Sequence, residues 1–184
     1  MHPYRRAILL APLVAPLAAA LTRCGVNALT PTQIVTEAGV AAKGLSGALA
    51  QLAAADPKLL PATTLSTLQN DLMLAQGAAS SLTSALPAAS GATVVQTVEG
   101  YLNAVLNTLA APPINGLIPT PFNLAIAAAA LLVPDLEAFV NQYLPTASAV
   151  SPATYAARLQ LRAAAPQVTT LDQAVAILRE YAAS

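Results

Sequence analysis

The sequence predicts an all-α protein, a helical bundle of four heptad-patterned helices followed by a C-terminal helical hairpin. Apolar residues make up 56% of the 184 residues, and many of them are alanine, which has the highest helix propensity. Along four segments separated by prolines, apolar residues recur at alternating spacings of three and four, which places them on one face of a helix. We find no run with the strict apolar-polar alternation that is typical of a half-buried strand.

The first helix is expected to follow Thr30 and to end at Asp56. Thr30, Pro31 and Gln33 match a capping box with proline in the first turn. Asp56 precedes Pro57, and the residue before a proline disfavours the helical conformation. The apolar seam of this helix is Val35, Ala38, Ala42, Leu45, Leu49 and Leu52.

The second and third helices show the same heptad pattern. The second is predicted after Pro61 and runs to about Leu86, where Pro87 stops it, and the third opens near Ser90 and ends near Ala111. The seam of the second helix is Leu65, Leu68, Leu72, Ala75, Ala79, Leu82 and Leu86. The seam of the third is Val95, Val98, Leu102, Val105 and Leu109.

The fourth helix is predicted to start after Thr120 and to break at Pro134. Proline lacks an N–H group and clashes with the preceding turn of a helix. Asp135 and Glu137, directly after it, suit the start of a new helix because acidic side chains are favourable there. The seam is Phe122, Ala125, Ala129, Leu132, Leu136, Phe139 and Tyr143.

Two short helices complete the chain. One begins at Ser151 with Pro152 in its first turn, and the last begins at a second capping box formed by Thr170 and Gln173. The apolar face predicted for the last helix is Leu171, Val175, Leu178 and Ala182.

The N-terminus has the layout of a secretory signal peptide. Residues 1–6 are short and positive, and residues 7–21 form an apolar run without charge. This run is too short for an ordinary membrane span of about 20 residues, and Pro12 and Pro16 interrupt it. We therefore expect the chain to be exported.

Leu21-Thr22-Arg23-Cys24 resembles the lipobox of bacterial lipoproteins, in which an apolar residue and two small residues precede the cysteine. Leu21 and Thr22 match this pattern, whereas Arg23 departs from it. The resemblance implies that Cys24 becomes the lipid-bearing first residue of the mature protein. A lipid would also cap a single thiol that has no internal disulfide partner. Cleavage near the alanines at 18–20, an uncleaved anchor and a buried structural cysteine remain open.

The predicted organisation is a signal peptide over 1–23, a tether over 24–30, an alanine-rich bundle over 31–146 and a hairpin over 147–184 packed on it. Without the leader, five basic residues face eight acidic ones, a net charge of about −3. This charge disfavours a nucleic-acid partner. We expect the protein in the cell envelope of a Gram-negative bacterium, facing the periplasm and anchored by lipid.

The residues that remain after the leader exclude several chemistries. The only histidine is His2 and the only cysteine is Cys24, so the body offers neither the ligands of a His/Cys zinc site nor a Ser-His-Asp or Cys-His nucleophile. It also lacks a glycine-rich phosphate loop. We therefore expect no enzyme, no catalytic residue, no metal and no cofactor.

Five charged residues are candidates for a site. Glu99 lies in an apolar run and could be a buried acid, but its place beside the seam favours the outer face. Asp135 and Glu137 are two residues apart and point away from each other on a helix. Arg158 and Arg162 lie one turn apart and could together contact an anionic ligand or lipid headgroups, or form a solvated face.

These observations predict an exported, lipid-anchored, non-enzymatic helical protein that acts as a structural or interaction module at a membrane. A surplus seam would bind a partner protein or a second copy. In composition the chain resembles small accessory lipoproteins of Gram-negative bacteria and their prophages. Two alternatives remain open: a membrane-active lysis or permeability protein that inserts residues 122–133, and a bundle that binds an apolar ligand between its alanine-lined helices.

Overall fold

The computed structural model describes residues 31–82, 88–144 and 150–183, and the regular structure in these ranges is helical throughout. The elements are α1 (Pro31–Ala55), α2 (Ala62–Ser80), α3 (Ala88–Ala110), α4 (Ile114–Leu117), α5 (Phe122–Tyr143), α6 (Pro152–Ala164) and α7 (Leu171–Ala183). The predicted all-α class is confirmed for this part of the chain.

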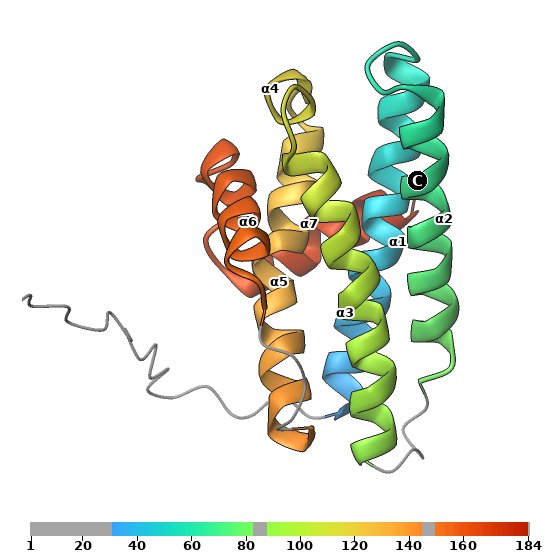
Figure 1. Ribbon diagram of the computed structural model, residues 1–184, viewed down its shortest axis with the longest axis vertical. Helices are drawn as coiled ribbons and strands as arrows, with labels where there is room; N and C mark the ends of the chain where they lie inside the picture. The colour runs from blue at the N-terminus through green and yellow to red at the C-terminus, as the bar shows by residue number, and fades with distance from the viewer. Residues whose placement is uncertain (1–30, 83–87, 145–149, 184) are drawn as a thin grey trace, which may run out of the picture.

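Four long helices form an up-and-down bundle. Each of α1, α2, α3 and α5 packs against the next, and α5 packs against α1, which closes the ring. Figure 1 shows these helices running alternately up and down along the long axis. Short connections between consecutive helices produce this antiparallel arrangement. The brief helix α4 packs on α3 at one end of the bundle.

The heptad seams predicted from the sequence form the core. All five seam residues of the third helix are fully buried, and in α1 the seam from Ala38 to Leu52 is buried as well. In α2, Leu65 is half-buried and Leu68, Leu72, Ala75 and Ala79 are buried. The helix ends at Ser80, before the predicted end near Leu86, and Leu82 is buried beyond that end. Thr30, Leu86 and the side chain of Val35 lie outside the described residues.

The central helix of the fold is α5. It packs against four other helices, α1, α3, α6 and α7. All six residues from Ala125 to Ala130 are buried, and five of them are alanine. Small side chains let several neighbouring backbones approach one helix closely, which explains why this run can be enclosed on all faces.

The predicted break at Pro134 is wrong, because α5 continues without interruption from Phe122 to Tyr143. Leu132, Val133 and Leu136 are buried on both sides of the proline, whereas Pro134 itself is exposed. The turns on both sides of Pro134 pack against the neighbouring helices, and this packing outweighs the loss of the hydrogen bond that proline cannot donate. Helix propensity alone does not predict this outcome.

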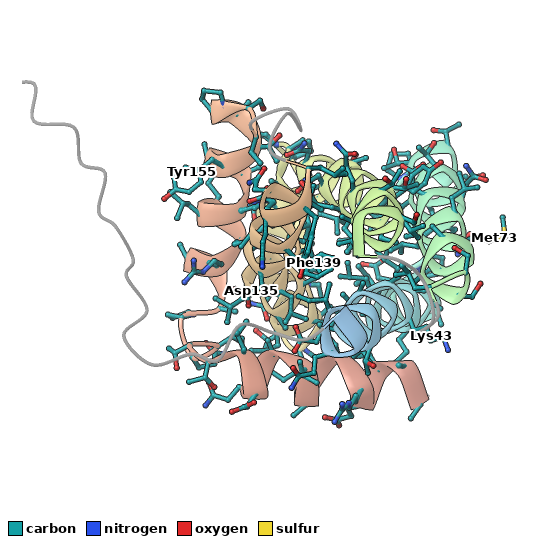
Figure 2. All side chains as sticks on the ribbon, turned by 90° about the horizontal axis from the view of Figure 1, so that it is seen from below. Lys43, Met73, Asp135, Phe139 and Tyr155 are labelled. Carbon is teal, nitrogen blue, oxygen red and sulfur yellow. The ribbon has the colours of Figure 1, made fainter. Side chains whose placement is uncertain are left out.

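The two C-terminal helices pack on the bundle individually. α6 lies against α3 and α5, whereas α7 lies against α1 and α5. In Figure 2, α7 extends along one side of the bundle beneath α1 while α6 covers the adjacent side next to α5. The predicted pair of helices is therefore present, but its members cover two faces of the bundle and are held mainly by the long helices.

The start of each C-terminal helix is capped as the sequence predicts. Ser151 Oγ accepts a hydrogen bond from the Thr154 amide at 3.1 Å. At α7, the Gln173 amide donates to Thr170 Oγ1 and the Thr170 amide donates to Gln173 Oε1, both at 3.3 Å. These reciprocal bonds are the capping box, which satisfies amides that have no partner inside the helix.

The buried face of α7 differs from the predicted one. Ala174, Leu178 and Tyr181 are buried, Val175 is half-buried and Ala182 is exposed. The reason is the close crossing of α7 over α1, which places the Leu178 side chain against Gly44 of α1, while the Tyr181 ring packs against Phe122 of α5.

Gly44 and Gly47 on α1 form the crossing point with α7. A Cβ atom added to Gly44 would lie 2.5 Å from the carbonyl oxygen of Leu178, and one added to Gly47 would lie 2.0 Å from that of Tyr181. Both distances are far below van der Waals contact. Only glycine therefore permits the two backbones to approach this closely.

Candidate functional site

A buried polar cluster lies where α6 meets α3 and α5. We define it by four residues: Glu99 and Asn103 on α3, Glu137 on α5 and Arg158 on α6. The Arg158 side chain is 4% exposed and that of Glu137 16% exposed. A charged side chain is almost never buried to this degree unless it is paired, so its partners decide what the site can do.

The guanidinium of Arg158 holds the cluster together. Its Nε and Nη2 donate to Asn103 Oδ1 at 3.0 and 2.7 Å, and Nη2 also donates to Glu137 Oε1 in an ion pair. Asn103 Nδ2 in turn donates to Glu99 Oε1 at 3.0 Å. A continuous hydrogen-bonded chain thus links one side chain from α5, one from α6 and two from α3.

Glu99 is half-buried, and its pKa is raised from 4.5 to about 7. Burial is the largest cause, followed by the negative charge of Glu137. The charge of Arg158 comes next and lowers the pKa, a side-chain hydrogen bond with Glu137 raises it, and the hydrogen bond from Asn103 lowers it. The cluster therefore contains a carboxyl group that changes its charge near neutral pH.

A cavity of about 190 Å³ adjoins the two glutamates. Gln96 and Gly100 of α3, Val140 and Asn141 of α5, and Val150 before α6 complete its lining. The carboxyl groups of the cluster thus border a space large enough for several water molecules.

The interpretation of Glu99 as an outer-face residue is wrong. The seam argument correctly predicts that Val98 and Leu102 face the bundle core, but α6 covers the flank of α3 that carries Glu99. The sequence contains one signal for this site. Asn103 follows Glu99 by one helical turn, and Asn103 Nδ2 donates to Glu99 Oε1 within this turn.

The two arginines predicted to share an anionic contact are separated by the fold. Arg158 is buried against Asn103 and Glu137, whereas Arg162 is exposed. Their side chains therefore do not form a joint anion clamp. Cys24, the predicted lipid attachment site, lies outside the described residues.

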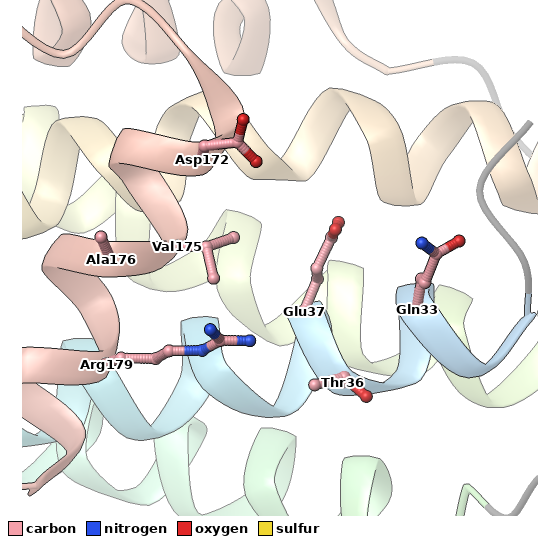
Figure 3. Close-up of a pocket in the computed structure, with 7 residues that line it drawn as sticks. All are labelled: Gln33, Thr36, Glu37, Asp172, Val175, Ala176 and Arg179. Carbon is pink, nitrogen blue, oxygen red and sulfur yellow. The ribbon is translucent and has the colours of Figure 1, made fainter. Parts of the chain in front are cut away.

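A second hollow of about 410 Å³ lies between the first half of α1 and α7 (Figure 3). Its charged residues are Glu37 on α1 and Asp172 and Arg179 on α7. In Figure 3 the side chains of Gln33 and Glu37 point to the same side of α1, and the Arg179 side chain reaches toward α1. This hollow has a mixed polar lining and is an open surface depression, in contrast to the buried cluster.

Within residues 31–82, 88–144 and 150–183, no group of three or more His, Cys, Asp or Glu residues is arranged to hold a metal ion. Comparison of the chain with protein-family models, with curated proteins and with solved structures finds no match.

Proposed function

We propose that the chain is an exported helical interaction module, held at a membrane of the Gram-negative envelope through lipid on Cys24, and that it binds a partner without catalysing a reaction. The proposal divides the chain into two parts. The leader and Cys24 provide the membrane attachment, and the helical bundle provides the binding surface.

The observation that carries this proposal is the position of the most apolar helix. By length and composition α5 could cross a membrane, with a mean hydropathy of 1.6, but 61% of its apolar window is buried inside the bundle. Inserting α5 into lipid would require the bundle to give up its central helix. Attachment through the N-terminal leader leaves the bundle intact, and the buried position of α5 therefore favours a tethered module over a membrane-inserting protein.

Exposed apolar side chains supply a surface for a partner. Tyr155 and Leu159 lie one turn apart on the outer side of α6, and Met73 and Leu74 are exposed on α2. Aromatic residues and methionine are enriched at protein interfaces. These positions support binding of another protein or of a second copy of the chain.

The test is intact mass measurement and membrane fractionation of the full chain expressed in a Gram-negative host, beside the Cys24→Ala variant. We expect the wild type to carry a lipid mass on its processed N-terminus and to sediment with membranes. The variant should lose the lipid and move to the soluble fraction, because the bundle itself has no exposed membrane segment in this proposal.

Two outcomes would overturn the proposal. If the wild type carries no lipid but still sediments with membranes, α5 becomes the candidate attachment segment. The membrane-active alternative then replaces the lipid-anchored module. If the wild type carries no lipid and is soluble, the tether is absent. A far-UV circular dichroism spectrum of Cys24→Ala serves as the folding control, since Cys24 precedes the bundle.

A further inference from the structure

The charges of the cluster do not balance when every group is ionised. One guanidinium, that of Arg158, faces the carboxylates of Glu99 and Glu137. Arg158 forms its ion pair with Glu137, whereas Glu99 reaches Arg158 through its hydrogen bonds with Asn103 and Glu137. One negative charge in this half-buried site therefore lacks a cation of its own, and a proton on Glu99 removes it.

The docking of α6 depends strongly on this site. Arg158 and Leu161 are the buried side chains of α6, so a charged residue forms half of its buried anchor. Among the residues that the structure describes, two other hydrogen bonds join α6 to the long helices. Asn107 Nδ2 on α3 donates to Thr154 Oγ1 at 3.2 Å, and Asn123 Nδ2 on α5 donates to the carbonyl oxygen of Ala164 at 3.1 Å, both at exposed positions.

We propose that Glu99, Asn103, Glu137 and Arg158 form a proton-dependent clasp, which holds α6 on α3 and α5 while Glu99 is protonated and loosens α6 when Glu99 ionises. A neutral Glu99 can donate a hydrogen bond to Glu137, so that one proton and one guanidinium together satisfy the two carboxyl groups. An ionised Glu99 instead faces a like charge in a half-buried site, which is unfavourable.

The titration range supports this proposal. The pKa of Glu99 is raised to about 7 by burial and by Glu137, so the clasp would respond between weakly acidic and weakly basic conditions. The charged groups acting on Glu99 are Glu137 from α5 and Arg158 from α6. Both belong to the clasp, and both reach Glu99 from a different helix.

Loosening of α6 would uncover apolar surface. Leu161 is buried on the inner side of α6, whereas Tyr155 and Leu159 are exposed on the outer side of the same helix. A rise in pH would therefore extend the apolar surface around α6 by exposing Leu161 and the flanks of α3 and α5. This behaviour belongs to the bundle and does not depend on lipid attachment at Cys24.

The experiment is amide hydrogen exchange of the full chain between about pH 5.5 and 8.5, corrected for the intrinsic exchange rate and compared for wild type, Glu99→Gln and Glu180→Gln. In the wild type, we expect the protection factors of residues 155–162 to fall about tenfold across this pH range, while those of α3 stay constant. A tenfold change is the free-energy equivalent of one pKa unit. Glu99→Gln should keep this protection at all pH values, because glutamine resembles the protonated acid. Glu180, exposed on α7 outside the cluster, provides a matched loss of one charge, and its variant should follow the wild type.

The proposal is overturned if protection of α6 is independent of pH in the wild type, or if Glu99→Gln shows the same dependence as the wild type. A second measurement avoids reliance on the variant. The side-chain carboxyl carbon of Glu99, followed by NMR in the wild type, should titrate with the same midpoint as the loss of α6 protection. Different midpoints would also refute the clasp.

Discussion

The close crossing of α1 and α7 leads to a sharp prediction for Gly47→Ala. The new Cβ would lie 2.0 Å from the Tyr181 carbonyl oxygen and 2.9 Å from its carbonyl carbon. Both contacts are with backbone, so no side-chain rotation can relieve them. To restore ordinary contact, α7 must move away from α1 by roughly 1.4 Å.

The expected loss of stability is the difference between two effects. Alanine in place of glycine favours a helix by about 0.5–1 kcal/mol. Overpacking a tight interface costs about 1–3 kcal/mol. Displacement of α7 also exposes part of Leu178 and Tyr181, and complete burial of one large apolar side chain stabilises a protein by about 1.5–3 kcal/mol. The net loss for Gly47→Ala should be about 2–4 kcal/mol.

Urea unfolding followed by circular dichroism measures this difference directly. The matched control is Gly77→Ala on α2, where an added Cβ would meet no atom within 4 Å. This control should raise the free energy of unfolding by about 0.5–1 kcal/mol, since only the helix propensity changes. The two variants thus carry the same chemical change and should have opposite effects.

The reasoning is refuted if Gly47→Ala is as stable as the wild type or more stable. Such a result would mean that α7 does not approach α1 as closely as the structure shows. Gly44→Ala gives an independent check, because its Cβ would lie 2.5 Å from the Leu178 carbonyl oxygen. It should destabilise the protein in the same direction.

Four further predictions concern the cluster, the core and a cap. The pKa of Glu99 is higher in the folded protein than its usual value of 4.5, so protonated Glu99 stabilises the fold fully below pH 4.5, and this stabilisation is lost as the pH rises through about 7. Urea unfolding should show about 1–2 kcal/mol lower stability at pH 8 than at pH 5, after allowance for solvent screening. A stability that does not change with pH would contradict this prediction. Arg158→Met leaves Glu137 without its cation and should cost about 3 kcal/mol in the same assay, with Arg162→Met as the exposed control. Leu102→Ala empties a fully buried position and should cost about 2–5 kcal/mol, and a loss below 1 kcal/mol would show that the site collapses. Thr170→Ala removes the side-chain half of a capping box and should lower the thermal midpoint by an amount equivalent to about 1 kcal/mol, with Thr63→Ala, exposed in the first turn of α2, for comparison.

The bundle could be predicted from the sequence because periodicity alone places its core. Val95, Val98, Leu102, Val105 and Leu109 repeat at heptad spacing, and all of them are fully buried. Prolines and capping residues also mark most helix ends, as Ser151 and Thr170 illustrate. These signals are local, and local patterns survive folding when the tertiary contacts agree with them.

Features that depend on contacts between distant segments could not be predicted in this way. Pro134 signals a break when it is considered alone, yet the helices packed around α5 keep it continuous. The polar cluster joins residues separated by up to 59 positions, and nothing near Glu99 in the sequence indicates that α6 covers it. The role of Gly44 and Gly47 likewise depends on where α7 crosses α1.

The alanine-rich centre of α5 has a consequence for the chain before it folds. A helix enclosed on every side by other helices needs an apolar surface all around, which is also what a lipid bilayer selects. Leucine favours insertion at the centre of a bilayer by about 0.3–0.6 kcal/mol per residue, so a leucine-built central helix would compete strongly for lipid during synthesis or export. Five alanines between Ala125 and Ala130 fill the same place with far less apolar area, and Asp135 and Glu137 further along the helix oppose insertion. Small side chains thus allow α5 to be deeply buried in the bundle, and in the export that we propose they would give the chain little reason to stop in the membrane.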